Sequence, residues 1–321
     1  MNSVKKLVVL DFDNTLFDAL GRWEICLGRL MDEFSRANDI SLEIVDSLVR
    51  EAHGQHRFND GAALVDAIIE ADPQLHQKAL SKENAGIKKA WLDDNAKTVT
   101  FYDGVLNALK FWQRQGVRCV IETDCEQVAV YRNLWYLGVK ACKRGDLQYT
   151  CEVLDFFDKI YCQPGIQESK SYLSEVENDF ITRAKGKTHV WEDRTYKPSA
   201  DHMAQILFDC DVPAENAIYI GDSYKDGAEA ATVSPPVDFV WAAYGTNVNE
   251  EVLGLYARVG SKSFTYGMQS IKKIMKERDI VPAQILKAEL SEVLALYDWE
   301  LPAPIRQMTS SVFPQQNFDV T

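Results

Sequence analysis

The feature of the sequence that most constrains the fold is the apolar run Leu7-Val8-Val9-Leu10, followed at once by Asp11-Phe12-Asp13. Four consecutive apolar residues predict a strand that is buried on both faces of a parallel sheet. Asp11 then lies where the strand leaves the sheet at its carboxyl end, the edge at which open α/β sheets bind ligands. The sequence therefore predicts an α/β fold with a site at this edge.

The two aspartates have the spacing that places both side chains on one side of an extended segment. Carboxylates this close repel each other, and Mg²⁺, which binds carboxylates together with substrate phosphate oxygens, relieves the repulsion. The ionised carboxylate could attack phosphorus, and a neighbour with a raised pKa could protonate the leaving oxygen. Thr15 could fix the turn by bonding backbone groups. Taken alone, the segment fits a strand followed by an Asp-rich turn equally well.

Further polar signals occur at strand ends and at a helix start. Apolar runs over residues 117–121 and 217–220 predict two more buried strands. Between them a lysine stands directly before Pro198, which disfavours helix at the lysine and allows one to begin beyond it. Singly, each signal could be an ordinary strand end, turn or surface lysine. The candidate residues are Thr123 after the second strand, Lys197, and Asp222 and Asp226 after the third strand.

In this order the signals resemble the four motifs of the haloacid dehalogenase (HAD) superfamily, over roughly residues 4 to 245. The resemblance implies a doubly wound, Rossmann-like parallel sheet over residues 1–17 and 100–246, with an all-helical cap inserted at residues 18–99. It also implies Mg²⁺-dependent hydrolysis of a small phosphomonoester, a phosphorylated metabolite, through an aspartyl-phosphate. The implied roles are Asp11 as nucleophile, Asp13 as general acid and base, Thr123 and Lys197 as phosphoryl contacts, and Asp11, Asp13, Asp222 and Asp226 at the metal.

Two other functions stay open on the same scaffold. A phosphomutase would pass the phosphoryl group to a second hydroxyl of a sugar phosphate instead of to water. A non-catalytic binding or regulatory module is disfavoured, because such proteins tend to lose one of the four residues Asp11, Asp13, Lys197 and Asp222, and all are present. Asp13 argues against dehalogenation, because dehalogenase members lack a carboxylate at that position.

The sequence departs from the family next to Thr123, where Glu122 precedes it and Asp124 stands in place of the frequent Asn. Negative charge beside an anion-binding site is costly unless it points away or meets a cation. Asp124 is thus a candidate substrate contact whose role is open.

The predicted cap has helical apolar spacing almost throughout, with Ser41 as the N-cap of its second helix. Arg57, in a polar interruption at residues 53–60, could contact a second phosphate or a carboxylate of the substrate, or could lie in a solvated loop. Phosphonate-cleaving members of the family form a Schiff base on a lysine of the cap. Lys88 and Lys89 lie in the predicted cap, but they fit a solvated helix face better than that role. The segment 163–189 fits a surface insert better than an excursion to the pocket edge.

Composition favours a cytoplasmic enzyme. The seven cysteines form no C-x-x-C pair, which fits reduced thiols. The N-terminus leaves no room for a signal peptide, and no apolar run approaches the length of a membrane span. A net charge of −13 opposes nucleic-acid binding. Residues 247–300 are predicted to form a helical extension that packs on the core or on a partner chain, as in a homodimer, and residues 301–321 a flexible tail.

Overall fold

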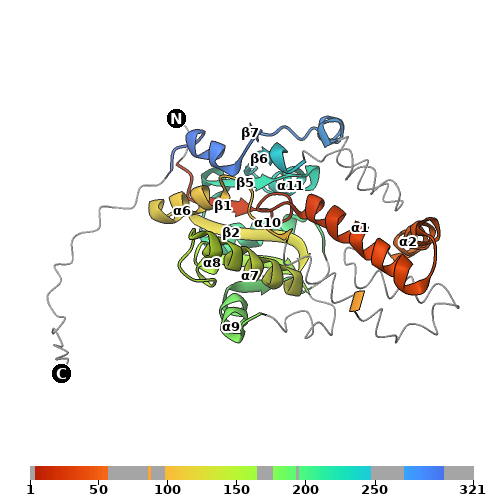
Figure 1. Cartoon of the computed structure of the whole chain (residues 1–321). Helices are drawn as coiled ribbons and strands as arrows, with labels where there is room; N and C mark the ends of the chain where they lie inside the picture. The colour runs from red at the N-terminus through yellow and green to blue at the C-terminus, as the bar shows by residue number, and fades with distance from the viewer. Residues whose placement is uncertain are drawn as a thin grey trace, which may run out of the picture.

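A seven-stranded parallel sheet forms the centre of the protein in this computed structural model (Figure 1). The structure describes residues 4–56, 86–87, 98–164, 176–192, 195–246 and 271–299. The strand order is β4-β3-β2-β1-β5-β6-β7. In chain order the elements are β1 (Leu7–Leu10), α1 (Ala19–Asn38), α2 (Leu42–His56), α6 (Val105–Gln115), β2 (Arg118–Glu126), α7 (Gln127–Arg144), α8 (Glu152–Asp155), β3 (Lys159–Gln163), α9 (Asn178–Lys187), β4 (Thr188–Val190), α10 (Ala200–Cys210), η2 (Ala214–Asn216), β5 (Ala217–Gly221), α11 (Tyr224–Ala230), β6 (Asp238–Ala242), η3 (Ala243–Thr246), β7 (Gln284–Leu286) and η4 (Leu290–Ala295).

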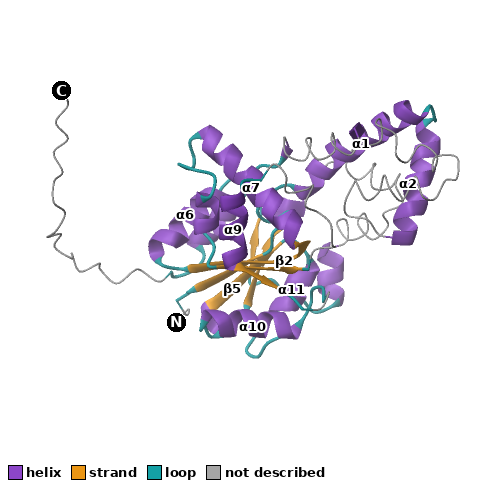
Figure 2. Ribbon diagram, turned by 90° about the horizontal axis from the view of Figure 1, so that it is seen from below, coloured by secondary structure: helices purple, strands orange, loops and turns teal. Residues whose placement is uncertain are grey.

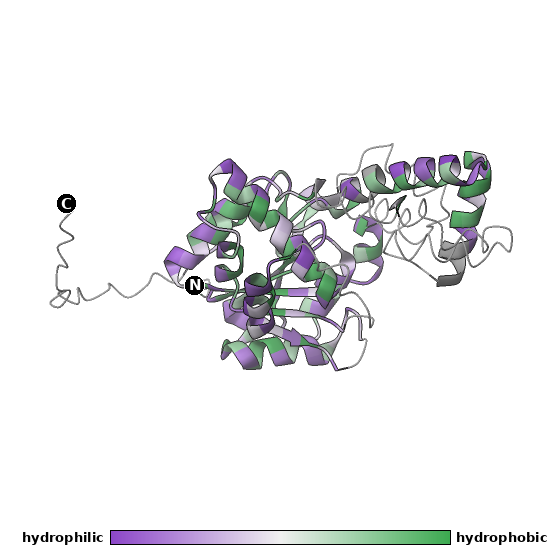
Figure 3. Cartoon of the chain, turned by 60° about the horizontal axis from the view of Figure 1, so that its bottom comes forward, coloured by the Kyte–Doolittle hydropathy of each residue, from purple (hydrophilic) through white to green (hydrophobic). Residues whose placement is uncertain are grey.

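The first strand is buried on both faces, as its apolar run predicts. Val8 and Leu10 face a hydrophobic core shared with α6, α7, α8 and α9. Leu7 and Val9 face a second core shared with α10 and α11. Figure 2 shows the two helical layers on opposite sides of the sheet, and Figure 3 shows mainly hydrophobic strands between helices of mixed hydropathy. The predicted doubly wound α/β core is therefore confirmed.

The chain reverses its direction of winding at β1, which pairs with β2 on one side and with β5 on the other. In open α/β sheets, ligands bind at the carboxyl ends of the strands beside such a reversal. The second strand extends to Glu126, beyond the predicted residues 117–121, with an irregular register against β3 between Glu122 and Glu126.

Helices α1 and α2 project from the edge of the core that carries these strand ends (Figure 1). Ser41 caps α2 as expected, since its hydroxyl accepts from the backbone N–H of Ile44 at 3.4 Å. Arg57, Lys88 and Lys89 lie outside the described residues, as do most of residues 57–97 and the tail at 301–321. The extent of the cap therefore stays a prediction.

The interpretation of residues 163–189 as a surface insert is wrong for their described part. Phe180 and Ala184 of α9 are fully buried, and Phe180 packs edge-on against Trp135 of α7 with ring centroids 5.3 Å apart. Strand β4 pairs with β3. The sequence is misleading because this short amphipathic helix needs only a narrow apolar stripe in an otherwise polar segment.

The helical extension predicted over residues 247–300 is also wrong in part. Within its described part, residues 271–277 are helical, but Leu286 ends β7 and pairs with Ala242 of β6, and Leu290–Ala295 form only a 3₁₀ helix. Leu286 at the strand end is followed by Leu290 and Val293 in the 3₁₀ helix, so these apolar residues are spaced by four and three positions. The apolar face of an α-helix has the same spacing, which explains the prediction. The sheet therefore continues into the range 247–300, which is not wholly a helical extension.

All seven cysteines lie among the described residues and none forms a disulfide. Within the described ranges, no helix combines the length and the apolar composition that a membrane span needs.

Candidate active site

A buried lysine holds three carboxylates together at the carboxyl ends of β1, β2 and β5. The Nζ atom of Lys197 lies 2.6 Å from Asp11 Oδ1 and 2.9 Å from Asp226 Oδ1. It also lies 3.0 Å from Glu122 Oε2 and donates to the backbone carbonyl of Glu122 at 3.0 Å. These four side chains are at most 10% exposed. The structure thus brings Asp11, Lys197 and Asp226 together as the sequence predicts.

Asp11 is held on both sides by other side chains. Lys197 binds its Oδ1, and the hydroxyl of Thr15 donates to its Oδ2 at 3.0 Å. Thr15 therefore fixes the carboxylate itself, rather than only the turn. The carbonyl of Thr15 accepts from the hydroxyl of Tyr244 at 2.7 Å. This network orients the Asp11 carboxylate without any substrate.

Burial dominates the protonation equilibria of the cluster. It raises the pKa of Asp11 to about 8; Lys197 opposes the rise, while Asp226 and Asp13 add to it. The pKa of Asp222 is also raised, by burial and by Asp11. Burial alone would lower the pKa of Lys197, but the surrounding carboxylates outweigh it and raise that pKa well above its ordinary value. The cluster therefore has more buried carboxylates than its one lysine can neutralise, and a further cation would stabilise it.

The oxygen ligands for such a cation are in place. Asp11, Asp222 and Asp226 each offer a carboxylate oxygen, all within 4.8 Å of one another. Asp222 follows β5, and its backbone carbonyl accepts from the indole N–H of Trp241 at 2.9 Å. Asp226 closes a capping box with Ser223 at the start of α11. Gly221 permits this packing, because a Cβ atom there would lie 2.4 Å from Cγ of Asp226.

Asp13 lies beside Cys125, and its two carboxylate oxygens differ in their contacts. Its Oδ2 accepts from the thiol of Cys125 at 2.8 Å, whereas its buried Oδ1 has no hydrogen-bond partner in the described part of the chain. The backbone N–H of Cys125 donates to Thr123 Oγ1 at 3.0 Å. The hydroxyl proton of Thr123 is therefore available to a ligand.

Asp124 points away from this cluster and meets a cation. Its Oδ1 accepts from the backbone N–H of Lys197 at 2.9 Å, and its Oδ2 lies 3.3 Å from Nζ of Lys225. Because the protein engages both oxygens, the acidic residue next to Thr123 adds no unpaired charge to the site. Its contact with Lys197 fixes the backbone from which the buried lysine extends.

Sequence reasoning missed Arg22, a buried cation at the start of α1. Its Nη1 donates to Asn133 Oδ1 at 2.8 Å, and its Nε has no hydrogen-bond partner among the described residues. Burial lowers the pKa of Arg22; Asp13 opposes this change and Arg132 adds to it. A single arginine in an amphipathic helix does not indicate a site residue from sequence alone. The proximity of Arg22 to Asp13 becomes apparent only in the folded structure.

No protein-family model and no curated protein matches the sequence. Among solved structures, the chain is similar to a putative beta-phosphoglucomutase from Thermotoga maritima, with 13% identity, a TM-score of 0.52, and coverage of 91% of this chain and 99% of that chain. A predicted phosphoglycolate phosphatase from Haemophilus somnus has 13% identity and a TM-score of 0.46, covering 91% of this chain and 97% of that one. The magnesium-bound putative HAD-hydrolase YfnB from Bacillus subtilis has 14% identity and a TM-score of 0.46, covering 92% and 99%. The first of these likenesses shows that the chain shares the α/β fold of that structure.

Proposed function

We propose that the protein is a Mg²⁺-dependent phosphatase that hydrolyses a small phosphomonoester through an aspartyl-phosphate on Asp11. The observation that carries this proposal is the 2.6 Å contact between Lys197 and Asp11, with Asp222 and Asp226 within ligand distance of Asp11. A nucleophilic carboxylate, a fixed cation and an oxygen-rich metal site are what phosphoryl transfer requires.

The residues present fit Mg²⁺, because the donors are all hard oxygen atoms and their buried negative charge exceeds that of Lys197. Asp11, Asp222 and the backbone carbonyl of Asp13 would hold the ion, with Asp226 supporting them. When bound, Mg²⁺ would neutralise charge on the phosphoryl oxygens.

In the first step, a carboxylate oxygen of Asp11 forms a bond to phosphorus as the bond from phosphorus to the leaving oxygen breaks. Asp13 gives a proton to the leaving oxygen from Oδ1, which no described residue of the protein engages. Thr123 donates its hydroxyl proton to a phosphoryl oxygen, and Lys197 neutralises the developing charge. In the second step, Asp13 takes a proton from water, whose oxygen attacks phosphorus. This attack releases inorganic phosphate and restores Asp11.

We also propose that residues 18–99 form a cap that selects the leaving group. The projection of α1 and α2 beside the strand ends supports this assignment (Figure 1). Arg22 lies on this side of the site and would attract an anionic group of the substrate. Arg57 stays a second candidate for that role.

The test is phosphate release from p-nitrophenyl phosphate with Mg²⁺. Asp11→Asn should lower turnover by at least about 10³-fold, because an amide cannot act as the nucleophile. Asp39→Asn is the matched control: Asp39 ends α1 in a left-handed conformation, which Asn also tolerates. Unchanged turnover in Asp11→Asn would refute the mechanism. Isomerisation of a sugar phosphate without phosphate release would identify a phosphomutase instead.

A further inference from the structure

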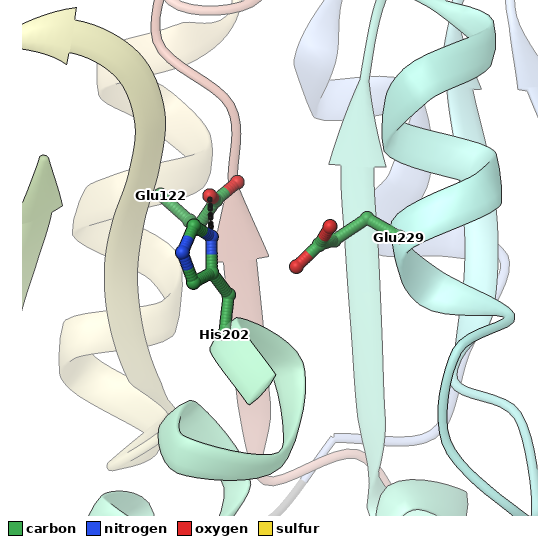
Figure 4. Close-up of side chains that lie close together, drawn as sticks. All are labelled: Glu122, His202 and Glu229. Atoms are coloured by element: carbon green, nitrogen blue, oxygen red, sulfur yellow. Dashed lines mark ion pairs between the residues drawn. The ribbon is translucent and has the colours of Figure 1, made fainter. Parts of the chain in front are cut away.

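A second group of metal-ligating side chains lies behind Lys197, on the face of the sheet covered by α10 and α11. It consists of Glu122 from β2, His202 from α10 and Glu229 from α11 (Figure 4). Each residue offers one ligand atom, and these atoms lie within 4.8 Å of one another. The two glutamates are fully buried and His202 is 3% exposed.

Among the described residues, Glu229 Oε1 has no hydrogen-bond partner, and Figure 4 shows the carboxylate of Glu229 directed toward the other two side chains. Glu122 Oε1 and His202 Nδ1 form no hydrogen bond within the criteria either, but they face each other at 3.5 Å, an ion pair when His202 is protonated. Buried polar atoms are nearly always satisfied in folded proteins, by protein groups, water or an ion. The three atoms come from three different elements and therefore mark a position for a shared ligand.

The remaining oxygen of each glutamate and the ring of His202 are held by contacts within the protein. Glu122 Oε2 accepts from the hydroxyl of Tyr219 at 2.5 Å, and the other oxygen of Glu229 accepts from the backbone N–H of Ser199. The ring of His202 stacks on Trp191, with centroids 3.8 Å apart and planes 1° apart. Such contacts orient the ligands of a metal ion and leave one atom of each side chain free to bind it.

The charge of the group also calls for a cation. Among the described residues, Glu122 contacts Lys197 and, when it is protonated, His202. Lys197 is shared with Asp11 and Asp226, so no permanent cation of the described chain is left for Glu229. Burial, reinforced by Glu122, raises the pKa of Glu229 to about 8.

We propose that Glu122, His202 and Glu229 bind a second divalent metal ion of the zinc type, distinct from the ion proposed at Asp11 and Asp222. An imidazole with two carboxylates favours Zn²⁺, whereas the all-oxygen Asp11 group favours Mg²⁺. Glu122 Oε1 and His202 Nδ1 are 3.5 Å apart. This separation is close to the roughly 3.4 Å expected between tetrahedral ligands with bonds of about 2.1 Å.

The second ion would act on the active site through Lys197. A cation beside Glu122 takes over the neutralisation of that carboxylate, so that the charge of Lys197 serves Asp11 and the phosphoryl group. The link between this metal and the active site is Lys197, whose Nζ contacts both Glu122 and Asp11. The role of the metal would be structural and electrostatic.

The test measures metal content and does not depend on catalysis. The protein is expressed in zinc-supplemented medium, dialysed against a chelator and analysed by plasma mass spectrometry. We expect about one zinc per chain in the wild type and in Asp222→Asn, which removes a proposed Mg²⁺ ligand. Glu229→Gln and His202→Phe, which keeps a ring against Trp191, should lower zinc at least about tenfold. Glu177→Gln, at an exposed glutamate, should retain it.

Two results would overturn the proposal. One is folded wild-type protein that holds less than about a tenth of a zinc per chain, which would mean that protons satisfy the cluster. The other is zinc that Asp222→Asn loses and Glu229→Gln keeps, which would place zinc at the Asp11 group. The wild-type measurement is decisive even if a variant does not fold.

Discussion

Replacing Lys197 by Met tests whether this lysine is the electrostatic centre of the site. Methionine keeps most of the length and volume of the side chain and removes its charge and its three donors. The change leaves Asp11, Asp226 and Glu122 without the cation that they share at 2.6, 2.9 and 3.0 Å. Packing changes little, so the effect measures the charge.

The expected loss of stability follows from the burial of these partners. Side chains that are 0 to 10% exposed cannot regain solvation, and removing one partner of a buried ion pair costs about 3 to 5 kcal/mol. Lys225 provides a matched control, because its side chain is 43% exposed and its Nζ lies 3.3 Å from Asp124 Oδ2. An exposed pair of this kind contributes about 0 to 1 kcal/mol. The two Lys→Met variants should therefore differ by at least about 2 kcal/mol.

Urea unfolding at pH 7, followed by circular dichroism with EDTA present, measures this difference without bound metal. With a slope of about 2 kcal/mol per molar urea, the midpoint of Lys197→Met should fall by about 1.5 to 2.5 M. Its phosphatase activity with Mg²⁺ should fall at least about 10²-fold, because the transition state loses a fixed positive charge. Equal unfolding midpoints for the Lys197 and Lys225 variants would refute the electrostatic reasoning.

Three further substitutions test other parts of the structure. Gly245→Ala should destabilise the fold by about 3 kcal/mol or more in urea unfolding, because its Cβ would lie 1.6 Å from the backbone oxygen of Asn14. The pKa of Asp209 is lowered, because three hydrogen bonds outweigh its partial burial. Asp209→Asn should therefore lower the free energy of unfolding by about 1.5 to 3 kcal/mol above pH 5. The difference from the wild type should shrink as the pH falls below about 4, because wild-type Asp209 then takes up a proton. Arg22→Gln should raise KM roughly 10- to 100-fold for substrates with a second anionic group and much less for p-nitrophenyl phosphate; equal changes for both would remove Arg22 from substrate binding.

The parts of the fold that sequence predicts well are those with a strong local signal. The run Leu7–Leu10 and the strand Ala217–Gly221 are apolar at every position before the final glycine, so their burial on both faces follows directly from composition. Asp11 and Asp222 directly follow these strands, so they lie at the carboxyl ends of the two strands. Their proximity was predictable because parallel strands bring their carboxyl ends to one edge.

The parts that sequence predicts poorly depend on pairing across the fold. Leu286 fits a helical spacing, yet it ends a strand because β6 offers a free edge. Asp124 is a candidate substrate contact from sequence, whereas the structure places it against the backbone N–H of Lys197 and the side chain of Lys225. Neither contact has a local signature, because each partner comes from a distant part of the chain.

The acidic residue before Thr123 shows how the two kinds of information combine. Side chains alternate along β2, so Glu122 shares a face with Val120, which packs in the core with α10 and α11. Alternation alone therefore directs Glu122 away from Ile121 and toward those helices. A charge that looked unfavourable beside an anion site is thus placed behind Lys197. There burial alone would raise the pKa of Glu122, but Lys197, His202 and Tyr219 outweigh it and lower that pKa.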